Sequence, residues 1–189
     1  MKNPIATFHM NSGKSIVIEL MPEKAPNTVN SFIWLAKLGC YNDHAIQRIV
    51  PGYVIDASYT AFNFAPAKYL IAAESRAFGA PNDLRLDPGV IAMGGYGDHG
   101  MAGGEFFFPL AYNPKLDGYY PGFGVIREGL EEVLRWEQAP TKAVHLPGNP
   151  MQVNEPLEPI VIESVEIETF GETYPEPVKL ETDWLPMTW

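Results

Sequence analysis

One stretch decides how this chain folds: Ile46-Gln47-Arg48-Ile49-Val50-Pro51-Gly52-Tyr53-Val54-Ile55-Asp56. Its valine, isoleucine and tyrosine residues favour β-strand, and Pro51-Gly52 interrupts the apolar run as a turn or a bulge does. Arg48 is the single cation in this stretch. Because a guanidinium stays charged, it must reach water, a carboxylate or a ligand. Arg48 therefore has two possible roles. It is a surface residue paired with a carboxylate, which is the commoner case, or it lies beside an apolar groove and presents its N–H donors to a polar group of a bound molecule.

The residues before this stretch predict a hairpin and a helix. Apolar residues alternate with polar ones on both sides of Asn11-Ser12-Gly13, which predicts a β-hairpin over residues 4–20. Asn27 or Thr28 can then cap a helix, since the following apolar residues recur at helical spacing. We expect this helix near residues 27–38, where it would cover the open end of a sheet.

The residues after the stretch predict more strands and one further helix. Residues 57–88 lack sustained periodicity and carry several aromatic residues, which is typical of a binding loop. Several strands, two helices far apart and no strand–helix alternation favour a mainly β fold, an antiparallel barrel whose ends are closed by the helices. The later elements are predicted as strands at 89–93, 105–108, 123–126 and 161–170, a helix near 128–137 and a Pro-rich loop over 137–159.

Composition restricts the classes of partner and compartment. The chain has 189 residues, 46% of them hydrophobic, and a net charge of −10, so nucleic acid and anionic lipid are poor partners. No stretch approaches the roughly 18 apolar residues that a membrane helix needs. A single cysteine, Cys40, excludes an internal disulfide and fits a reducing compartment. Because no apolar segment follows Met1-Lys2-Asn3-Pro4, we expect a cytoplasmic protein.

Motifs for nucleotide, metal or nucleophilic chemistry are weak. Gly95-Tyr96-Gly97-Asp98-His99-Gly100 matches GxGxxG, but no helix follows it and Asp98 would repel a pyrophosphate. The four histidines do not share metal-ligand spacing, and no serine lies in GxSxG. We therefore expect neither a metal nor a cofactor.

Several motifs in a fixed order carry a family resemblance. The chain resembles the cyclophilins, the barrel-type peptidyl-prolyl cis–trans isomerases, over about residues 4–170. The matching segments are Ile18-Glu19-Leu20, Ala25-Pro26-Asn27-Thr28-Val29-Asn30-Ser31-Phe32, Arg48-Ile49-Val50-Pro51-Gly52-Tyr53, Gly104-Glu105-Phe106-Phe107, Leu116-Asp117-Gly118 and Phe123-Gly124-Val125.

The resemblance implies a fold, a site and partners. The fold is a closed antiparallel eight-stranded β-barrel capped by two α-helices, here residues 1–170. Arg48 is implied as the catalytic cation, and Tyr120 stands where the family usually has a histidine. The implied ligands are Pro-containing peptides or unfolded segments, bound by a monomer. The residues implied as the lining of the proline pocket are Tyr53, Val54, Phe107 and Leu116.

Three departures from the family pattern concern this pocket. Asp56 and Glu105 replace neutral amides, and Tyr96 replaces a small residue. We expect Tyr96 to narrow the pocket beside the proline slot. We also expect Arg48 to contact Asp56, Glu105 or both, which would keep the carboxylates ionised and weaken the donor. Two functions remain open: an attenuated isomerase of X–Pro bonds, or a module that binds Pro-containing peptides with little turnover.

Residues 171–189 form an acidic, Pro-containing extension. Glu168-Thr169-Phe170-Gly171 and the segment after it look like the extension of bacterial cytoplasmic cyclophilins. We expect the extension to pack on the barrel with Trp184 or Trp189 partly buried, the alternative being a disordered acidic tail.

Overall fold

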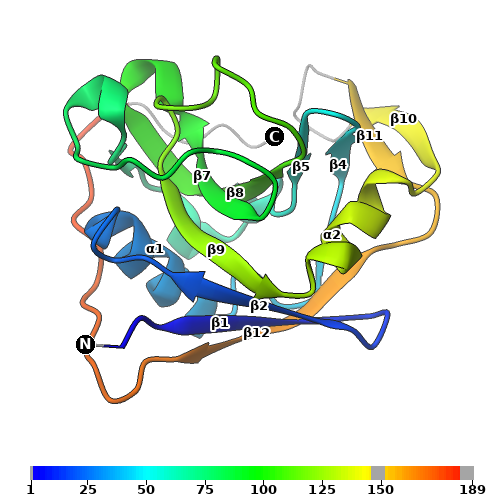
Figure 1. Cartoon of the computed structure of the whole chain (residues 1–189), viewed down its shortest axis with the longest axis horizontal. Coiled ribbons are helices and arrows are strands. Elements are labelled where there is room, and N and C mark those ends of the chain that lie inside the picture. Colours follow the sequence, from blue (N-terminus) through cyan, green and yellow to red (C-terminus); the bar gives the residue numbers. More distant parts are fainter. Residues whose placement is uncertain (1, 146–151, 184–189) are drawn as a thin grey trace.

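The structure is a computed structural model that describes residues 2–145 and 152–183. Its elements are β1 (Ile5–Met10), β2 (Ser15–Leu20), α1 (Pro26–Lys37), β3 (His44–Ala45), β4 (Arg48–Val50), β5 (Val54–Asp56), β6 (Ile71–Ala72), β7 (Val90–Tyr96), β8 (Met101–Pro109), β9 (Gly122–Glu128), α2 (Leu130–Glu137), β10 (Thr141–His145), β11 (Gln152–Pro156) and β12 (Val161–Glu168). A ten-stranded antiparallel sheet has the order β3-β12-β1-β2-β9-β7-β8-β5-β4, with β6 paired to β8 (Figure 1).

The sheet curls into a barrel. Its two end strands, β3 and β4, are separated in the chain only by Ile46 and Gln47, so the sheet returns on itself. The mainly β antiparallel barrel with two helices is thereby confirmed. The barrel differs in detail from the expected eight closed strands. The short strands β3 and β6, of two residues each, raise the number of strands to ten. Within the described residues, the end strands β3 and β4 are connected along the chain but do not pair with each other.

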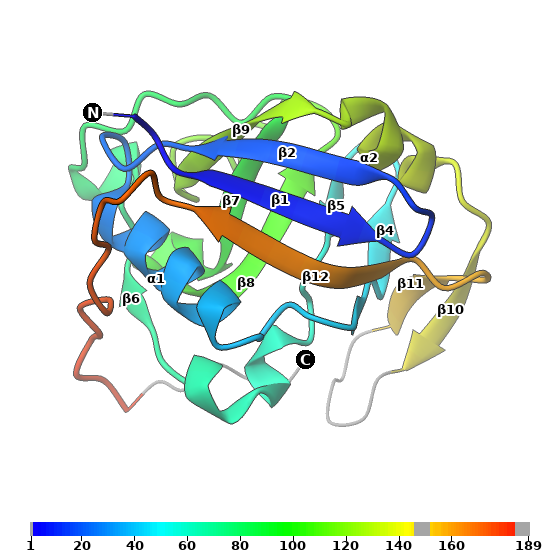
Figure 2. The same ribbon diagram turned by 90° about the horizontal axis from the view of Figure 1, so that it is seen from below.

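Aromatic side chains fill the barrel and attach both helices to it. Phe32 of α1 has its ring centroid 5.7 Å from that of Phe106 on β8 and 5.3 Å from that of Phe123 on β9. At the other end, Trp136 of α2 lies 6.1 Å from Phe108 of β8. The two helices therefore cover opposite ends of the barrel, as Figure 2 shows.

Most predicted elements are confirmed, with differences in the glycine- and proline-rich parts. The hairpin β1–β2 pairs Ile5 with Glu19, and both helices lie where their spacing predicts. The loop expected over 137–159 is wrong in part, because β10 and β11 form a separate hairpin there. Strands β7 and β8 also run further than expected, since glycines join the ladder without any apolar alternation to reveal them.

The described part of the extension packs along α1. The side-chain nitrogen of Asn27 donates to the backbone oxygen of Val178 (2.9 Å), and the N–H of Val178 donates back to the Asn27 side chain (2.8 Å). The N–H of Leu180 donates to the oxygen of Leu70, and Lys179 lies 4.4 Å from the centre of the Trp34 ring. Docking is thus confirmed for the extension up to Leu180, whereas Trp184 and Trp189 lie outside the described residues.

Within the described residues, no helix is both long and apolar enough to cross a membrane.

Candidate functional site

Strand alternation places the candidate residues on the outer face of the barrel. In β8, Phe106 and Phe108 point into the core, so the alternating residues Glu105 and Phe107 point to the outer face. Arg48 and Asp56 face each other across β4 and β5, and Asp56 in turn pairs with Phe107. The tight turn at Pro51-Gly52, with Gly52 at φ 70°, sets this register.

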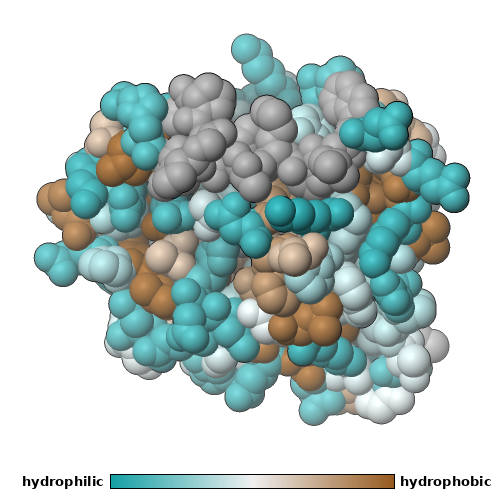
Figure 3. Space-filling model, turned by 180° about the vertical axis from the view of Figure 1, so that it is seen from behind, coloured by the Kyte–Doolittle hydropathy of each residue, from teal (hydrophilic) through white to brown (hydrophobic). Residues whose placement is uncertain are grey.

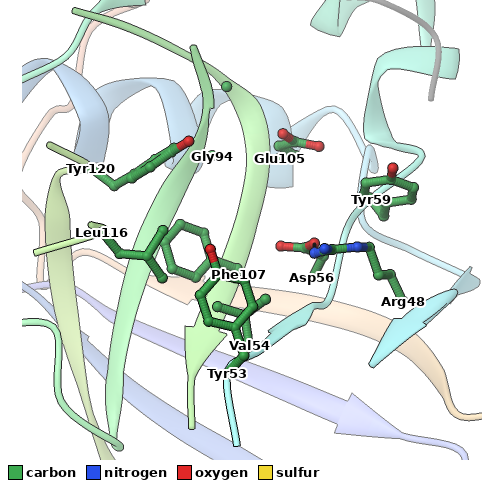
Figure 4. Close-up of a pocket in the computed structure, with 11 residues that line it drawn as sticks. Arg48, Tyr53, Val54, Asp56, Tyr59, Gly94, Glu105, Phe107, Leu116 and Tyr120 are labelled. Atoms are coloured by element: carbon green, nitrogen blue, oxygen red, sulfur yellow. Dashed lines mark hydrogen bonds and ion pairs between the residues drawn. The ribbon is translucent and has the colours of Figure 1, made fainter. Parts of the chain in front are cut away.

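These residues surround a cavity of about 200 Å³ on the outer face. This volume lies below the usual range for drug-sized ligands, about 300–1,000 Å³, and suits one small apolar side chain. Apolar residues form one end and charged residues the other (Figure 4). The lining consists of Arg48, Tyr53, Val54, Asp56, Tyr59, Gly94, Gly95, Glu105, Phe107, Leu116 and Tyr120.

The apolar end of the cavity is lined by side chains that pack against one another. Val54, Phe107 and Leu116 belong to one buried cluster, and Tyr53 and Tyr120 pack against it. The rings of Phe107 and Tyr120 meet edge to face at 5.5 Å and 87°. These five residues form an apolar basin, which can hold a compact ring.

A second cavity lies beside the first. It has a volume of about 480 Å³ and shares three side chains with the first, namely Tyr53, Leu116 and Tyr120. Asp98, Lys115 and Tyr119 complete its wall. The two cavities are therefore neighbours on the outer face, with these three side chains between them.

At the charged end, Arg48 forms an ion pair with Asp56. Nη1 of Arg48 donates to Oδ2 of Asp56, and the two side chains are 20% and 18% exposed. The guanidinium carbon also lies 5.7 Å from the centre of the Tyr59 ring. Burial lowers the pKa of Arg48, but Asp56 more than offsets this, so the net pKa shift is upward and the guanidinium stays charged. Burial raises the pKa of Asp56, against the opposing effect of Arg48.

Glu105 behaves differently from Asp56. Among the described residues, no ion pair joins it to Arg48, although both line the cavity. Burial, and next the negative charge of Asp56, raise the pKa of Glu105 well above its ordinary value. Arg48 was expected to contact Asp56, Glu105 or both, and of these two carboxylates only Asp56 forms a described ion pair with it. For Glu105, burial and the charge of Asp56 oppose the ionised form that a contact with Arg48 was expected to keep.

Tyr96 does not reach the wall of this cavity. A shift of register between Met93 and Gly95 precedes it, and Tyr96 pairs with Met101 at the end of the β7–β8 ladder. Gly94 and Gly95 line the cavity in its place. Tyr96 therefore does not line the proline slot itself, and the expectation that it narrows the pocket beside the slot stays a prediction; next to Gly94, the space is taken up by the side chain of Glu105.

The structure thus brings together eight of the nine predicted site residues and adds three more. The additions are Tyr59, Gly94 and Gly95. Tyr59 lies in the aperiodic segment after β5, where no pattern fixes its direction. Gly94 and Gly95 carry no side chain, so no residue pattern in the sequence marks them as lining of the cavity. Within the described residues, no group of three or more His, Cys, Asp or Glu side chains could hold a metal ion.

Two curated relatives resemble the chain. Peptidyl-prolyl cis-trans isomerase CYP23 of Arabidopsis thaliana is 32% identical over 124 residues, which are 64% of this chain and 55% of that protein, so the chain spans about half of that relative. Peptidyl-prolyl cis-trans isomerase-like 1 of Aspergillus fumigatus is 26% identical over 139 residues, which are 74% of this chain and 86% of that protein.

A solved structure shares the fold. A cyclophilin-type peptidyl-prolyl cis-trans isomerase of Cryptosporidium parvum matches with a TM-score of 0.70 and 20% identity, covering 89% of this chain and 99% of its own. A second structure of that protein, in the presence of the dipeptide Ala-Pro, matches with a TM-score of 0.69.

A family model covers most of the barrel. The model described as cyclophilin type peptidyl-prolyl cis-trans isomerase/CLD matches residues 5–167, which run from the first strand of the barrel to the last. The order of the strands, the two helices at the barrel ends and the outward-facing arginine beside an apolar basin agree with that match. The chain therefore belongs to the family of cyclophilin-type peptidyl-prolyl cis–trans isomerases.

Proposed function

We propose that the protein isomerises X–Pro peptide bonds in the cavity beside Arg48, at a rate held down by the Arg48–Asp56 ion pair. One observation carries this proposal: a charged guanidinium lies at the end of an apolar basin sized for one small ring. Val54, Phe107 and Leu116 would hold the proline ring, and the peptide would continue toward Tyr53 and Tyr120 and the second cavity.

The reaction requires neither a nucleophile nor a cofactor. Resonance makes the C–N bond resist rotation with a barrier of about 18–20 kcal/mol. When the amide twists, its nitrogen loses this resonance and gains a lone pair that can accept a hydrogen bond. An N–H of Arg48 aimed at that nitrogen binds the twisted amide better than the planar one, which is how an enzyme lowers a barrier.

Asp56 limits this donor. One N–H of Arg48 is already given to Asp56 in the free protein, so a bound amide competes with a carboxylate for the guanidinium. A carboxylate also offsets the positive charge that attracts the lone pair. Other N–H groups of the guanidinium remain to serve the substrate, because arginine has five. We therefore expect activity that is present but weak.

The ion pair also favours a second candidate function. If Asp56 holds Arg48 throughout, the apolar basin still binds proline rings, and the protein acts as a module for Pro-containing peptides with little turnover. This candidate uses the same residues, so only a rate measurement separates the two.

Exchange NMR on a short Ala-Pro peptide tests the proposal. With catalytic amounts of protein, the cis and trans signals of the peptide should exchange faster than in its absence. Line broadening without faster exchange between the two isomers would show binding alone and would reject isomerase activity. Neither effect, at peptide concentrations up to the solubility limit, would reject both candidates.

The finer features of this function are also proposals. We infer that the substrates are Pro-containing peptides or unfolded segments, as the Ala-Pro dipeptide used with the Cryptosporidium protein suggests. We infer a cytoplasmic monomer that assists protein folding, of the bacterial type with a C-terminal extension. A lone buried Cys40 fits a reducing compartment. On the face in Figure 3, hydrophobic side chains form separate patches between hydrophilic ones, as on a monomer. Light scattering of the purified protein tests the monomer.

A further inference from the structure

Glu105 is the carboxyl group of the cavity that the ion pair does not use. Its Oε2 is buried and has no hydrogen-bond partner among the described residues. The backbone N–H of Gly95 donates to its carboxyl group. Gly94 gives it room, because a Cβ at that position would lie 2.7 Å from Cγ of Glu105 and 2.8 Å from Oε1. Glu105 therefore lines the cavity, and one of its carboxyl oxygens, Oε2, is buried beside the cavity without a hydrogen-bond partner.

The charges around Glu105 are few. Burial raises the pKa of Tyr41 well above its ordinary value and that of Tyr120 to about 12, so neither phenol is charged near neutral pH. The charged neighbours are Arg48 and Asp56, which pair with each other. The ionisable groups that face Glu105 from the surrounding segments are Arg48, Asp56, Tyr41, Tyr59 and Tyr120.

The chemistry of the X–Pro bond indicates what this oxygen should offer. Proline has no backbone N–H, so the X–Pro amide presents acceptors only. An ionised carboxylate is also an acceptor only and would repel the carbonyl oxygen of the peptide. A protonated carboxylic acid has one O–H donor and would attract it.

We propose that Glu105 works as a protonated carboxylic acid, whose carboxyl group donates a hydrogen bond to a backbone carbonyl of the bound peptide at or beside its X–Pro bond. This inference rests on the proposed function, since it assigns a role in the same cavity. The buried position and the negative charge of Asp56 both favour the proton. Loss of that proton turns the donor into a repelling acceptor, so binding and turnover should fall as the pH rises.

The pH profile of kcat/KM tests the role of Glu105. In the wild type, kcat/KM should decline by up to roughly tenfold per pH unit above the pKa of Glu105. Glu105→Gln should remove this decline, because an amide keeps an N–H donor at every pH. Glu163→Gln makes the same substitution at an exposed position on β12 and should keep the wild-type profile. Infrared difference spectra should show a protonated carboxyl band near neutral pH that Glu105→Gln lacks.

The outcomes separate this inference from the proposed function. Turnover with the same profile in the wild type and in Glu105→Gln, or no protonated band, would overturn the role of Glu105 and leave the isomerase intact. If no variant shows turnover, the affinity for the Ala-Pro peptide is measured across the same pH range. Affinity that declines with pH in the wild type but not in Glu105→Gln would support the role of Glu105 while rejecting the enzyme. Affinity with equal pH dependence would overturn it.

Discussion

Arg48 and Asp56 are opposite each other because the turn between them is short. The chain reverses at Pro51-Gly52, so residues 48 and 56 become a cross-strand pair on the outer face. A guanidinium that is only 20% exposed needs a partner, and this geometry supplies one. The strength of this pair decides how much of Arg48 is left for a substrate.

We predict that Asp56→Asn raises the isomerase rate. A partly exposed ion pair contributes about 0.2–1 kcal/mol, so freeing Arg48 should raise kcat/KM by up to about fivefold. The same change in an Arg48→Ala background should have no effect, because the competition needs the guanidinium. An equal gain in both backgrounds, in a direct assay on the Ala-Pro peptide, would show that Asp56 acts by another route.

The sequence could identify the residues of the site but not their states. Arg48, Phe107 and Leu116 follow from motifs that resemble the family, and the pairing of Arg48 with a nearby carboxylate follows from the cost of a buried cation. Glu105 was expected to be ionised because it stands near Arg48 in the family fold. The rise in its pKa depends on burial over Gly94 and on which carboxylate Arg48 contacts, and no spacing in the sequence encodes either.

At the scale of elements, Phe32 is the side chain of α1 that makes ring contacts deep in the barrel core. Phe32 is fully buried and its ring contacts those of Phe8, Tyr41, Phe106 and Phe123. We predict that Phe32→Ala lowers the free energy of unfolding by about 3–5 kcal/mol, because it removes a large buried ring and leaves a cavity. Denaturant unfolding measures this change. Leu134→Ala on α2, where the side chain is 40% exposed, should cost much less. Equal losses would contradict this account of the core.

The extension should detach when its contact with α1 is lost. Both hydrogen bonds between the Asn27 side chain and the backbone of Val178 disappear in Asn27→Ala. We predict faster amide hydrogen exchange for residues 174–180 in this variant, with the barrel unchanged. Asn154→Ala, on the hairpin strand β11, serves as the matched control. Unchanged exchange in Asn27→Ala would show that Lys179 and Tyr174 suffice to hold the extension.

Elements with clear periodicity could be predicted, and those without it could not. The β1–β2 hairpin and both helices follow from regular apolar spacing, and each lies where expected. The β10–β11 hairpin has mostly exposed or half-exposed strands, so no buried face marks it in the sequence. The extent of β7 likewise depends on backbone pairing by Gly94 and Gly95, which carry no side chain to show alternation.

At the scale of the whole molecule, Glu132 and His44 are two of the groups that make stability depend on acidity. Hydrogen bonds from Arg135, Ser12 and Trp136 lower the pKa of Glu132 to about 2, and burial lowers the pKa of His44 to about 4. Both folded pKa values are depressed. His44 therefore reduces stability as the pH falls from about 6.5 toward 4, and Glu132 does so from about 4.5 toward 2.

We predict that Glu132→Gln flattens the acid limb of the stability curve. The shift from 4.5 to about 2 corresponds to about 3 kcal/mol, present above pH 4.5 and lost as the pH falls through 2. The free energy of unfolding, measured by urea titration at each pH, should keep this loss in the control Glu131→Gln, whose side chain is exposed. An unchanged acid limb in Glu132→Gln would show that other groups govern acid unfolding.

The central claim is that the guanidinium of Arg48 lowers the barrier of X–Pro rotation, and Arg48→Ala tests it most directly. Exchange NMR gives the isomerisation rate of the Ala-Pro peptide, and the same samples give its affinity. We predict that Arg48→Ala lowers kcat/KM by about 10²–10³-fold, as the loss of one transition-state donor does, while the apolar basin still binds the peptide. A variant that isomerises the peptide as fast as the wild type would contradict the account.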